Sequence, residues 1–469
     1  QPESPVTVML FAILLGFATI ARAGDSDPPN IVLLYSDDAG YADFGFQAHP
    51  AADMRGLTPN IDRLAASGAR CTDAYMSGAV CSPSRAGMLT GRYQQRFGHE
   101  FNIPPGYMDG GMSLSEKTVA DRLGQLGYRT GIVGKWHLGY PPEYHPNRRG
   151  FDEFYGLLQG SRPYFPMKKP TPHRILQHNG RPTPESGYVT DRIGDAAVAF
   201  IRESARSEKP FFLYVSFTAP HSPLQPKPEV EEALRRIKDP RRRKYAGLVK
   251  TLDDNVGKIL EVLDALELSG KTLVVFTNDN GGQTLNGAVN TPLRGRKGMI
   301  WEGGIRVPMA FRWPGKIPQG RVVRDPVISL DFLPTFVAAA GGRVEPSWKL
   351  DGANLLPLLT GRTDHLPERP LFWRIHGPER ESAIRRGKWK LVLEDHSPST
   401  KPQLYDLEND LAETTDVAST HPRLVESLAT ELAAWESQLI EPSWSPPKRA
   451  KRRSRPRGRS RQAKQATRK

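Results

Sequence analysis

The stretch Asn30-Ile31-Val32-Leu33-Leu34-Tyr35, followed at once by Ser36-Asp37-Asp38, decides the fold of this 469-residue chain. It is a short, continuous apolar run, which is typical of a strand that is buried on both faces of a parallel sheet. The carboxylates of Asp37 and Asp38 then stand just past the C-terminal end of that strand. The stretch therefore predicts a buried parallel strand that delivers two acidic side chains to one edge of a sheet.

Outward from this strand, further strands alternate with helices. Apolar runs at 132–135, 211–217 and 272–276 predict strands. Helix signals lie at 58–68, where Thr58 is a cap, at 113–127, where Ser113 and Glu116 form a capping box, and at 245–268. This alternation predicts an α/β fold, with a large domain whose mostly parallel central sheet is flanked by helices.

Polar side chains recur just past the C-terminal ends of these predicted strands. They are Asp37, Asp38, Lys135, His137, His221, Asp279 and Asn280. Ligands of open α/β sheets bind at this edge. Each residue alone could be an ordinary loop residue, but placement after four strands favours one shared site.

The pattern changes from about residue 371. Short strand candidates at 371–373, 388–393 and 404–407 are separated by turns, and a helix is predicted from 422 to 439. We expect a smaller C-terminal α+β domain with an antiparallel sheet and one packed helix. The expected division of the chain is a signal peptide at 1–23, a catalytic domain at 28–365, this subdomain at 366–443 and a tail at 444–469.

The net charge of +14 belongs mainly to that tail. Twelve lysines and arginines follow the last acidic residue, Glu441, and leave the rest of the chain at +2. The fold itself therefore gives no electrostatic argument for nucleic-acid binding. The tail lacks apolar residues larger than alanine after Trp444 and is predicted to be disordered. It could hold a polyanion such as sulfated polysaccharide, or be a solvated appendage with no fixed partner.

The N-terminal residues have the features of a secretory signal. Residues 6–20 are mostly apolar, and Ala21-Arg22-Ala23 has the small-x-small pattern of a signal-peptidase site. The run is short for a membrane-spanning helix, which needs about 20 apolar residues. We expect a cleaved signal and a secreted or periplasmic protein, with an uncleaved anchor as the alternative.

Two cysteines, Cys71 and Cys81, are too few to form a disulfide scaffold, although the two could pair. Cys71 is interpreted as a small buried hydrophobe. Cys81 opens the segment Cys81-Ser82-Pro83-Ser84-Arg85, in which Ser82 is a good N-cap and Pro83 a good first helical residue. Cys81 would then lie at the positive end of a helix, a position that suits an anion and lowers the pKa of a thiol. The pattern alone also fits a structural cysteine and arginine.

The residues that follow, Ala86-Gly87-Met88-Leu89-Thr90-Gly91-Arg92-Tyr93, make this segment resemble the type I sulfatases of the alkaline-phosphatase superfamily. The family signature C-x-P-S-R-A-x-L-L-T-G-R is matched with Met88 in place of its first leucine. The resemblance extends from Asn30 to roughly Leu439. Further motifs in family order are Gly134-Lys135-Trp136-His137-Leu138-Gly139, Ala219-Pro220-His221-Ser222-Pro223, Asn278-Asp279-Asn280-Gly281-Gly282, and Lys297 ahead of Trp301-Glu302-Gly303-Gly304-Ile305-Arg306.

The resemblance implies a sulfatase that acts on a sulfated carbohydrate or an aryl sulfate. Cys81 would be oxidised to formylglycine by a maturation enzyme, and the hydrated aldehyde would be the nucleophile. A gem-diol has a chemical rationale, because one oxygen attacks sulfur and loss of the other oxygen's proton expels sulfate and restores the aldehyde.

The resemblance also assigns the catalytic side chains. Arg85, Lys135 and Lys297 would hold the sulfate and the diol. His137 would be the base that opens the sulfated hemiacetal, and His221, with Lys297, would protonate the leaving alcohol.

A cation site follows from ligand chemistry, since Asp37, Asp38, Asp279 and Asn280 are hard oxygen donors that suit Ca²⁺ or Mg²⁺ rather than zinc. By resemblance these four bind the metal, usually calcium, and an oxygen of the modified Cys81 completes the shell. The cation would polarise the nucleophile and neutralise a sulfate oxygen.

Two rival functions are open from sequence alone. A phosphodiesterase or phosphonate monoester hydrolase of the same superfamily can share the C-x-P-S-R nucleophile and the carboxylate metal site. A non-catalytic secreted protein that binds polyanions is opposed by the presence of all the expected site residues. The histidines His99, His145, His173 and His178 could contact substrate or have no role, and residues 241–244 are interpreted as the solvated start of the long helix.

Overall fold

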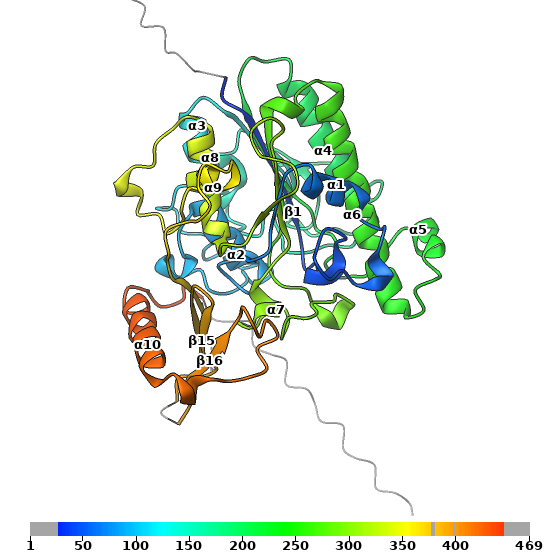
Figure 1. The fold of residues 1–469 in the computed structure, drawn as a ribbon. Helices are drawn as coiled ribbons and strands as arrows, with labels where there is room; N and C mark the ends of the chain where they lie inside the picture. The colour runs from blue at the N-terminus through cyan, green and yellow to red at the C-terminus, as the bar shows by residue number, and fades with distance from the viewer. Residues whose placement is uncertain (1–26, 377–379, 398, 445–469) are drawn as a thin grey trace, which may run out of the picture.

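The computed structural model describes residues 27–376, 380–397 and 399–444. A ten-stranded sheet with helices on both faces forms the larger part, and a four-stranded sheet with one helix lies at one end of it (Figure 1). In the described part of the chain, no helix is both long and apolar enough to span a membrane. The expected signal peptide, and all of the expected tail except Trp444, lie outside the described residues.

The central sheet has the strand order β11-β2-β10-β9-β1-β8-β4-β5-β6-β7. Its strands are β1 (Asn30–Ser36), β2 (Ala69–Cys71), β4 (Arg129–Lys135), β5 (Glu153–Leu157), β6 (Gln177–His178), β7 (Arg181–Pro182), β8 (Phe211–Ser216), β9 (Thr272–Asn278), β10 (Met309–Arg312) and β11 (Arg321–Val323). Strands β9, β1, β8, β4 and β5 are parallel, whereas β10 runs antiparallel to both of its neighbours. The predicted fold class, with a mostly parallel central sheet, is confirmed.

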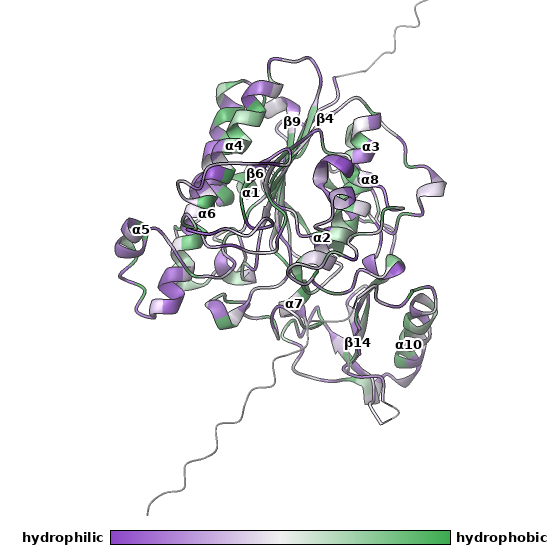
Figure 2. Cartoon of the chain, turned by 180° about the vertical axis from the view of Figure 1, so that it is seen from behind, coloured by the Kyte–Doolittle hydropathy of each residue, from purple (hydrophilic) through white to green (hydrophobic). Residues whose placement is uncertain are grey.

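The apolar run that predicted β1 fills both layers of the core. Ile31, Leu33 and Tyr35 pack into one hydrophobic cluster, while Val32 and Leu34 pack into the other, and all five are fully buried. Alternate side chains of a strand point to opposite faces, so a strand without polar positions needs cover on both sides. Figure 2 shows the apolar residues gathered along the sheet and the helix faces turned to it.

The helices supply that cover on the two faces (Figure 1). One face carries α1 (Pro59–Ala66), α4 (Val189–Ser204) and α6 (Pro240–Ala265), and the other carries α2 (Cys81–Thr90), α3 (Val119–Gln125), α8 (Phe332–Ala339) and α9 (Leu356–Leu359). Shorter elements are β3 (Ala74–Tyr75), β12 (Val327–Ile328), α5 (Pro228–Ala233) and α7 (Glu302–Ile305).

The predicted capping box at Ser113 and Glu116 is wrong. Helix α3 is capped instead by Thr118, whose Oγ1 accepts from the backbone N of Asp121 at 3.1 Å, while Asp121 Oδ2 accepts from the backbone N of Thr118 at 2.8 Å. The Thr118 hydroxyl also donates to the buried Arg149 carbonyl at 2.9 Å. That tertiary contact ties the helix start to Thr118, five residues later than the sequence pattern predicted.

The long helix α6 begins at Pro240, five residues before the predicted start. Asp239 Oδ1 accepts from the backbone N of Arg241 and Arg242, and Pro240 occupies the first helical position. Arg242 was predicted to be solvated but is buried, because it pairs with Asp43 at 2.8 Å and with Asp53 at 2.8 Å.

The C-terminal sheet is antiparallel, as predicted, in the order β13 (Leu371–Ile375), β14 (Glu381–Arg386), β15 (Trp389–Leu393) and β16 (Gln403–Asp406). Helix α10 (Pro422–Glu436) packs on it through Leu428, Leu432 and Trp435. The Trp435 ring stacks on Phe372 with 4.9 Å between centroids. The sequence missed β14 because charged residues at both of its ends conceal the buried centre.

Candidate active site

The predicted polar residues meet at the C-terminal edge of four adjacent strands. Asp37 and Asp38 follow β1, and Lys135 is the last residue of β4, with its Nζ 2.6 Å from Asp37 Oδ2. His221 follows β8 and places Nε2 3.5 Å from Asp38 Oδ2. Asn280 follows β9 and donates from Nδ2 to Asp38 Oδ1 at 2.9 Å. The parallel strands β9, β1, β8 and β4 therefore bring distant segments of the chain to one point.

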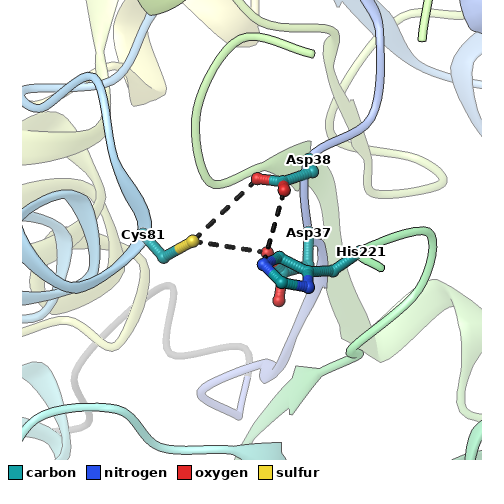
Figure 3. A group of neighbouring side chains, drawn as sticks. All are labelled: Asp37, Asp38, Cys81 and His221. Atoms are coloured by element: carbon teal, nitrogen blue, oxygen red, sulfur yellow. Dashed lines mark hydrogen bonds and ion pairs between the residues drawn. The ribbon is translucent and has the colours of Figure 1, made fainter. Parts of the chain in front are cut away.

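Cys81 lies against the two carboxylates (Figure 3). Its Sγ is 3.5 Å from Asp37 Oδ1, 3.9 Å from Asp38 Oδ1 and 3.0 Å from Lys297 Nζ. Helix α2 begins at Cys81 itself, with Val80 as the N-cap, so the prediction that Ser82 caps the helix is wrong. Ser82 instead uses its hydroxyl to donate to the His137 carbonyl at 2.7 Å, which ties the helix start to the loop after β4.

The expected lowering of the Cys81 thiol pKa is also wrong. Burial raises the pKa of Cys81, and the nearby Asp279 carboxylate adds to the rise, while Lys135 and Lys297 oppose it. An unmodified thiol at this position is therefore protonated at neutral pH and is a weak nucleophile. Cys71 is buried in β2, and both cysteines are free, so the two form no disulfide.

Three carboxylates and three cations form one buried group, which we name the site cluster. Its members are Asp37, Asp38, Asp279, Arg85, Lys135 and Lys297. Arg85 Nη2 donates to Asp279 Oδ2 at 2.9 Å, and Lys297 Nζ is 2.6 Å from Asp38 Oδ1. Charges this deeply buried persist only when they are paired, because desolvation of a lone charge is costly.

The pKa shifts in the site cluster follow from this pairing. Burial opposes ionisation of Asp279, but Arg85, Lys135 and Lys297 outweigh it and lower the pKa of that carboxyl. Burial likewise acts against the Lys297 ammonium, but the adjacent Asp38 raises the pKa of Lys297. Both groups are thus held ionised, and the cluster keeps a fixed electrostatic field.

His137 and Asp38 have strained backbones, with φ of 61° and 68° respectively. Residues other than glycine are rarely held in this region, and such strain gathers at functional sites. Burial, and then the Lys135 ammonium, lowers the pKa of His137, so its imidazole is neutral near pH 7. The His137 ring packs directly against Gly160, and a Cβ at that position would clash with the ring at 2.4 Å.

A pocket of about 170 Å³ opens over Cys81. Its walls are formed by Cys81, Asn102, Ile103, Pro105, His137, Tyr140, Gln159, Gly160, Ser161 and His221. Sequence reasoning missed Asn102, Tyr140 and Gln159, because no periodicity or motif marks these loop residues. Asn102 Oδ1 accepts from the backbone N of Ser82 at 2.9 Å, so this wall is joined to the helix start.

The residues fit a divalent cation. Asp37, Asp38, Cys81 and His221 offer ligand atoms that all lie within 4.8 Å of one another. The buried Asn280 Oδ1, beside Asp38, has no hydrogen-bond partner in the described part of the chain. An amide oxygen left without a donor among carboxylates is a suitable ligand for a hard cation.

Comparison with known proteins places this site in a family. The model of the Sulfatase family matches residues 29–342, and the one described as N-sulphoglucosamine sulphohydrolase, C-terminal, matches residues 296–438. The chain is 34% identical to arylsulfatase A of Homo sapiens in an alignment 485 positions long, which covers 92% of this chain and 91% of the relative. It is 34% identical to N-acetylgalactosamine-6-sulfatase of Canis lupus familiaris in an alignment 400 positions long, which covers 79% of this chain and 73% of the relative.

A solved structure gives the same picture. The crystal structure of Ps i-CgsB in complex with k-i-k-neocarrahexaose is similar with a TM-score of 0.84 and 38% identity, over 89% of this chain and 95% of that chain. Together with the fold, these matches define a sulfuric ester hydrolase and do not favour the phosphodiesterase alternative. The chain belongs to the type I sulfatases of the alkaline-phosphatase superfamily.

Proposed function

We propose that this sulfatase cleaves sulfate esters of carbohydrates with a formylglycine derived from Cys81 and a bound Ca²⁺. The observation that carries the proposal is the place of Cys81, whose Sγ lies between Asp37 and Lys297 at the base of the pocket. The carbohydrate substrate is supported by the similarity to N-acetylgalactosamine-6-sulfatase and to the protein in the neocarrahexaose complex.

The proposed groups supply chemistry that the chain itself lacks. A hydrated aldehyde at residue 81 provides a nucleophile that can release sulfate again, and a cation provides positive charge beside it. The cation would be held by Asp37, Asp38, Asp279 and Asn280, together with residue 81. These are oxygen donors, which favours Ca²⁺, or Mg²⁺, over softer metals.

The side chains of the site cluster bind and orient the sulfate. Arg85, Lys135 and Lys297 present fixed positive charge beside residue 81, where negative charge develops as the S–O bond to the leaving alcohol breaks. Because each cation is already held by a carboxylate, the field needs little reorganisation during the reaction.

The two histidines have separate proton roles. His137 is neutral and buried, and its Nδ1 has no hydrogen-bond partner in the described part of the chain, so it can accept a proton from residue 81. His221 Nδ1 donates to the Ser222 carbonyl at 2.6 Å, which leaves Nε2 facing Asp38 and the pocket. When Nε2 is protonated it can donate to the departing alcohol.

Mass analysis of the peptide that contains Cys81 tests the proposal. In active protein we expect this peptide to have lost its sulfur and to react with a hydrazine, whereas the peptide with Cys71 keeps a free thiol. Cys81→Ser should block turnover of an aryl sulfate, unless the host oxidises serine, which the same mass analysis would reveal. The control Cys71→Ala should remain active. Full activity with an unmodified thiol at Cys81 would contradict the mechanism.

Export and processing belong to the same proposal. A cleaved signal at residues 1–23 would bring the chain to the cell exterior or periplasm, where sulfated polysaccharides are met. The maturation enzyme that reads the Cys81 segment is the partner this mechanism requires. A domain division at about residue 365 is supported by the change from the mixed central sheet to the antiparallel sheet of β13 to β16, and the basic tail at 444–469 is proposed to contact polyanions.

A further inference from the structure

The loop that begins at Gly160 and Ser161, two residues of the active-site pocket wall, is rich in positive charge. Between Gly160 and Pro184 the sequence has five lysines and arginines and neither aspartate nor glutamate. Of these five, Arg162 is neutralised, since its Nη2 lies 2.7 Å from Glu185 Oε2. Arg174 is half-buried and forms no ion pair with any residue that the structure describes. A cation that lies near a pocket without a counter-ion in the protein is available to pair with an anionic group of a substrate.

Arg174 is fixed to the pocket wall at Gln159. The Gln159 side-chain oxygen accepts from Arg174 Nε at 2.9 Å and from Nη2 at 3.1 Å. The Gln159 backbone N also donates at 2.9 Å to the carbonyl of His173, the residue just before Arg174. These contacts use one edge of the guanidinium and leave Nη1 with no hydrogen-bond partner among the described residues. The guanidinium is therefore oriented with a free donor, which is how arginine binds sulfate and carboxylate groups.

Tyr140 adds a second unused donor at the same wall. Its side chain lines the pocket and is only 4% exposed, yet the hydroxyl has no hydrogen-bond partner in the described part of the chain. The ring stacks on His173 with 4.6 Å between centroids and an interplanar angle of 25°, which holds it in place. Burial raises the pKa of Tyr140 to about 12, and Arg174 is close enough to oppose that rise. The hydroxyl is thus a hydrogen-bond donor at neutral pH.

Arg174 is separate from the residues that act on the cleaved sulfate. It contacts no member of the site cluster, and Arg85, Lys135 and Lys297 already surround the position of that sulfate. We propose that Arg174 and the Tyr140 hydroxyl bind a second anionic group of the substrate, a sulfate or a carboxylate, so that the enzyme selects carbohydrates with more than one negative charge. This inference rests on the proposed carbohydrate substrate.

Competition against turnover of an aryl monosulfate tests the inference. The competitors are sulfated oligosaccharides in matched sets, which carry one sulfate, a second sulfate, or a carboxylate as the second charge. The wild-type enzyme should bind one of the doubly charged forms more tightly than the singly charged form. Arg174→Ala should weaken the binding of that doubly charged form by about tenfold, as expected for a charge-assisted bidentate contact. The same variant should bind the singly charged form as tightly as the wild type does.

Further variants separate recognition from loop structure. Arg174→Lys should keep part of the preference for doubly charged sugars. Tyr140→Phe removes only the hydroxyl and keeps the stacked ring, and it should weaken the binding of the doubly charged form. Arg181→Ala, an exposed arginine of the same loop, is the matched control and should change nothing. The aryl monosulfate kcat should be the same in the Arg174 and Arg181 variants as in the wild type, since this substrate has no second charge.

The outcomes are distinct. The inference alone is overturned if the wild type binds singly and doubly charged sugars equally, or if Arg174→Ala weakens both to the same extent. No competition by any sulfated sugar would overturn the carbohydrate substrate, and this inference with it. The second-sulfate and carboxylate arms show which anion occupies the position.

Discussion

Two charge clusters among the described residues have equal numbers of carboxylates and cations. The site cluster has three carboxylates and three cations at the edge of the central sheet. A second group, which we name the junction cluster, joins the central sheet to the C-terminal sheet. It also has three carboxylates and three cations, namely Asp73, Glu302, Glu413, Arg306, Arg385 and Lys390.

The two clusters differ in their hydrogen bonds. In the junction cluster Lys390 Nζ is within 2.9 Å of Glu302 Oε1, 2.7 Å of Glu413 Oε1 and 2.9 Å of the Ile300 carbonyl, and every buried polar atom of its six side chains has a partner. In the site cluster Arg85 Nε has no partner in the described part of the chain, and neither do the adjoining Asn280 Oδ1 and His137 Nδ1. Equal charge does not distinguish a structural cluster from a catalytic one, but hydrogen-bonding capacity left over beside a pocket does.

The largest expected effect is at the site cluster. Asp279→Ala should reduce aryl sulfate turnover by about a thousandfold or more, since it removes a proposed cation ligand from a preorganised electrostatic site. It should also lower the melting temperature, because Arg85 loses its closest carboxylate, and breaking such a buried pair costs about 3–5 kcal/mol. Turnover and thermal melting measure the two effects, with the exposed Asp254→Ala as control.

A chelator separates the two effects. After exhaustive chelation and dialysis, wild-type turnover should be lost and should return with Ca²⁺. The fold should survive, because Arg85, Lys135 and Lys297 already pair the carboxylates. Full activity in the chelator would rule out the metal assignment.

The junction cluster should show the opposite balance. Lys390→Met leaves Glu302 and Glu413 buried without their cation, and we expect about 3–5 kcal/mol of lost stability by denaturant unfolding. Turnover of the folded fraction should fall only moderately, through displacement of residues 300–302 and of Lys297 near them. Lys388→Met, which removes an exposed ion pair with Asp406 next to the same strand, should leave the stability nearly unchanged. If the Lys390→Met variant were as stable as the wild type, the junction cluster would not hold the two sheets together.

A smaller expected effect is a pH dependence of the difference in stability between the wild type and the Glu302→Gln variant. Burial opposes ionisation of Glu302, but Lys390, Arg306 and Arg385 outweigh it and lower its pKa to about 2. A depressed pKa stabilises the fold above the unfolded value of about 4.3, and this stability is lost as the pH falls toward the folded value. The stability difference between wild type and Glu302→Gln should therefore shrink from pH 5 to pH 3, by at most about 1.4 kcal/mol per pH unit. Unfolding curves at pH 5, 4 and 3 measure it, and a constant difference would contradict the shift.

The smallest expected effect is that of the basic tail. Deletion of residues 445–469 should leave aryl sulfate turnover unchanged, because the deletion begins after Trp444, whose ring packs edge to face against His99 with 4.6 Å between centroids. Retention on an anionic polymer should become weaker and less sensitive to salt. A truncated chain that fails to fold would show that the domain extends beyond Trp444.

How far the sequence predicts this molecule depends on whether a feature is local. The strand runs, and the polar residues after them, report a local pattern, so β1, β4, β8 and β9 and the residues at their ends were predicted. Helix starts depend on tertiary partners, as the Thr118 contact to the Arg149 carbonyl shows. The thiol pKa of Cys81 depends on burial by distant segments, which outweighs the helix end that the sequence reveals.

The pocket wall is the least predictable part. Tyr140, Gln159 and Arg174 come from loops whose spacing carries no period. Tertiary contacts bring them together, namely the stack of Tyr140 on His173 and the bond from the Gln159 backbone to the His173 carbonyl. The sheet fixes the position of a residue at the end of a strand. The positions of these loop residues depend instead on tertiary contacts that a single sequence does not show.

The depth of Cys81 has a consequence for the biosynthesis of the enzyme. The side chain is 1% exposed, and the residues around it from Cys81 to Thr90 are all buried within α2. A maturation enzyme must reach the Cys81 side chain, and this side chain is not accessible once α2 is packed. Under the proposed mechanism, oxidation of Cys81 must therefore precede folding, so each molecule has one brief interval, during synthesis or export, in which it becomes active or stays inactive permanently.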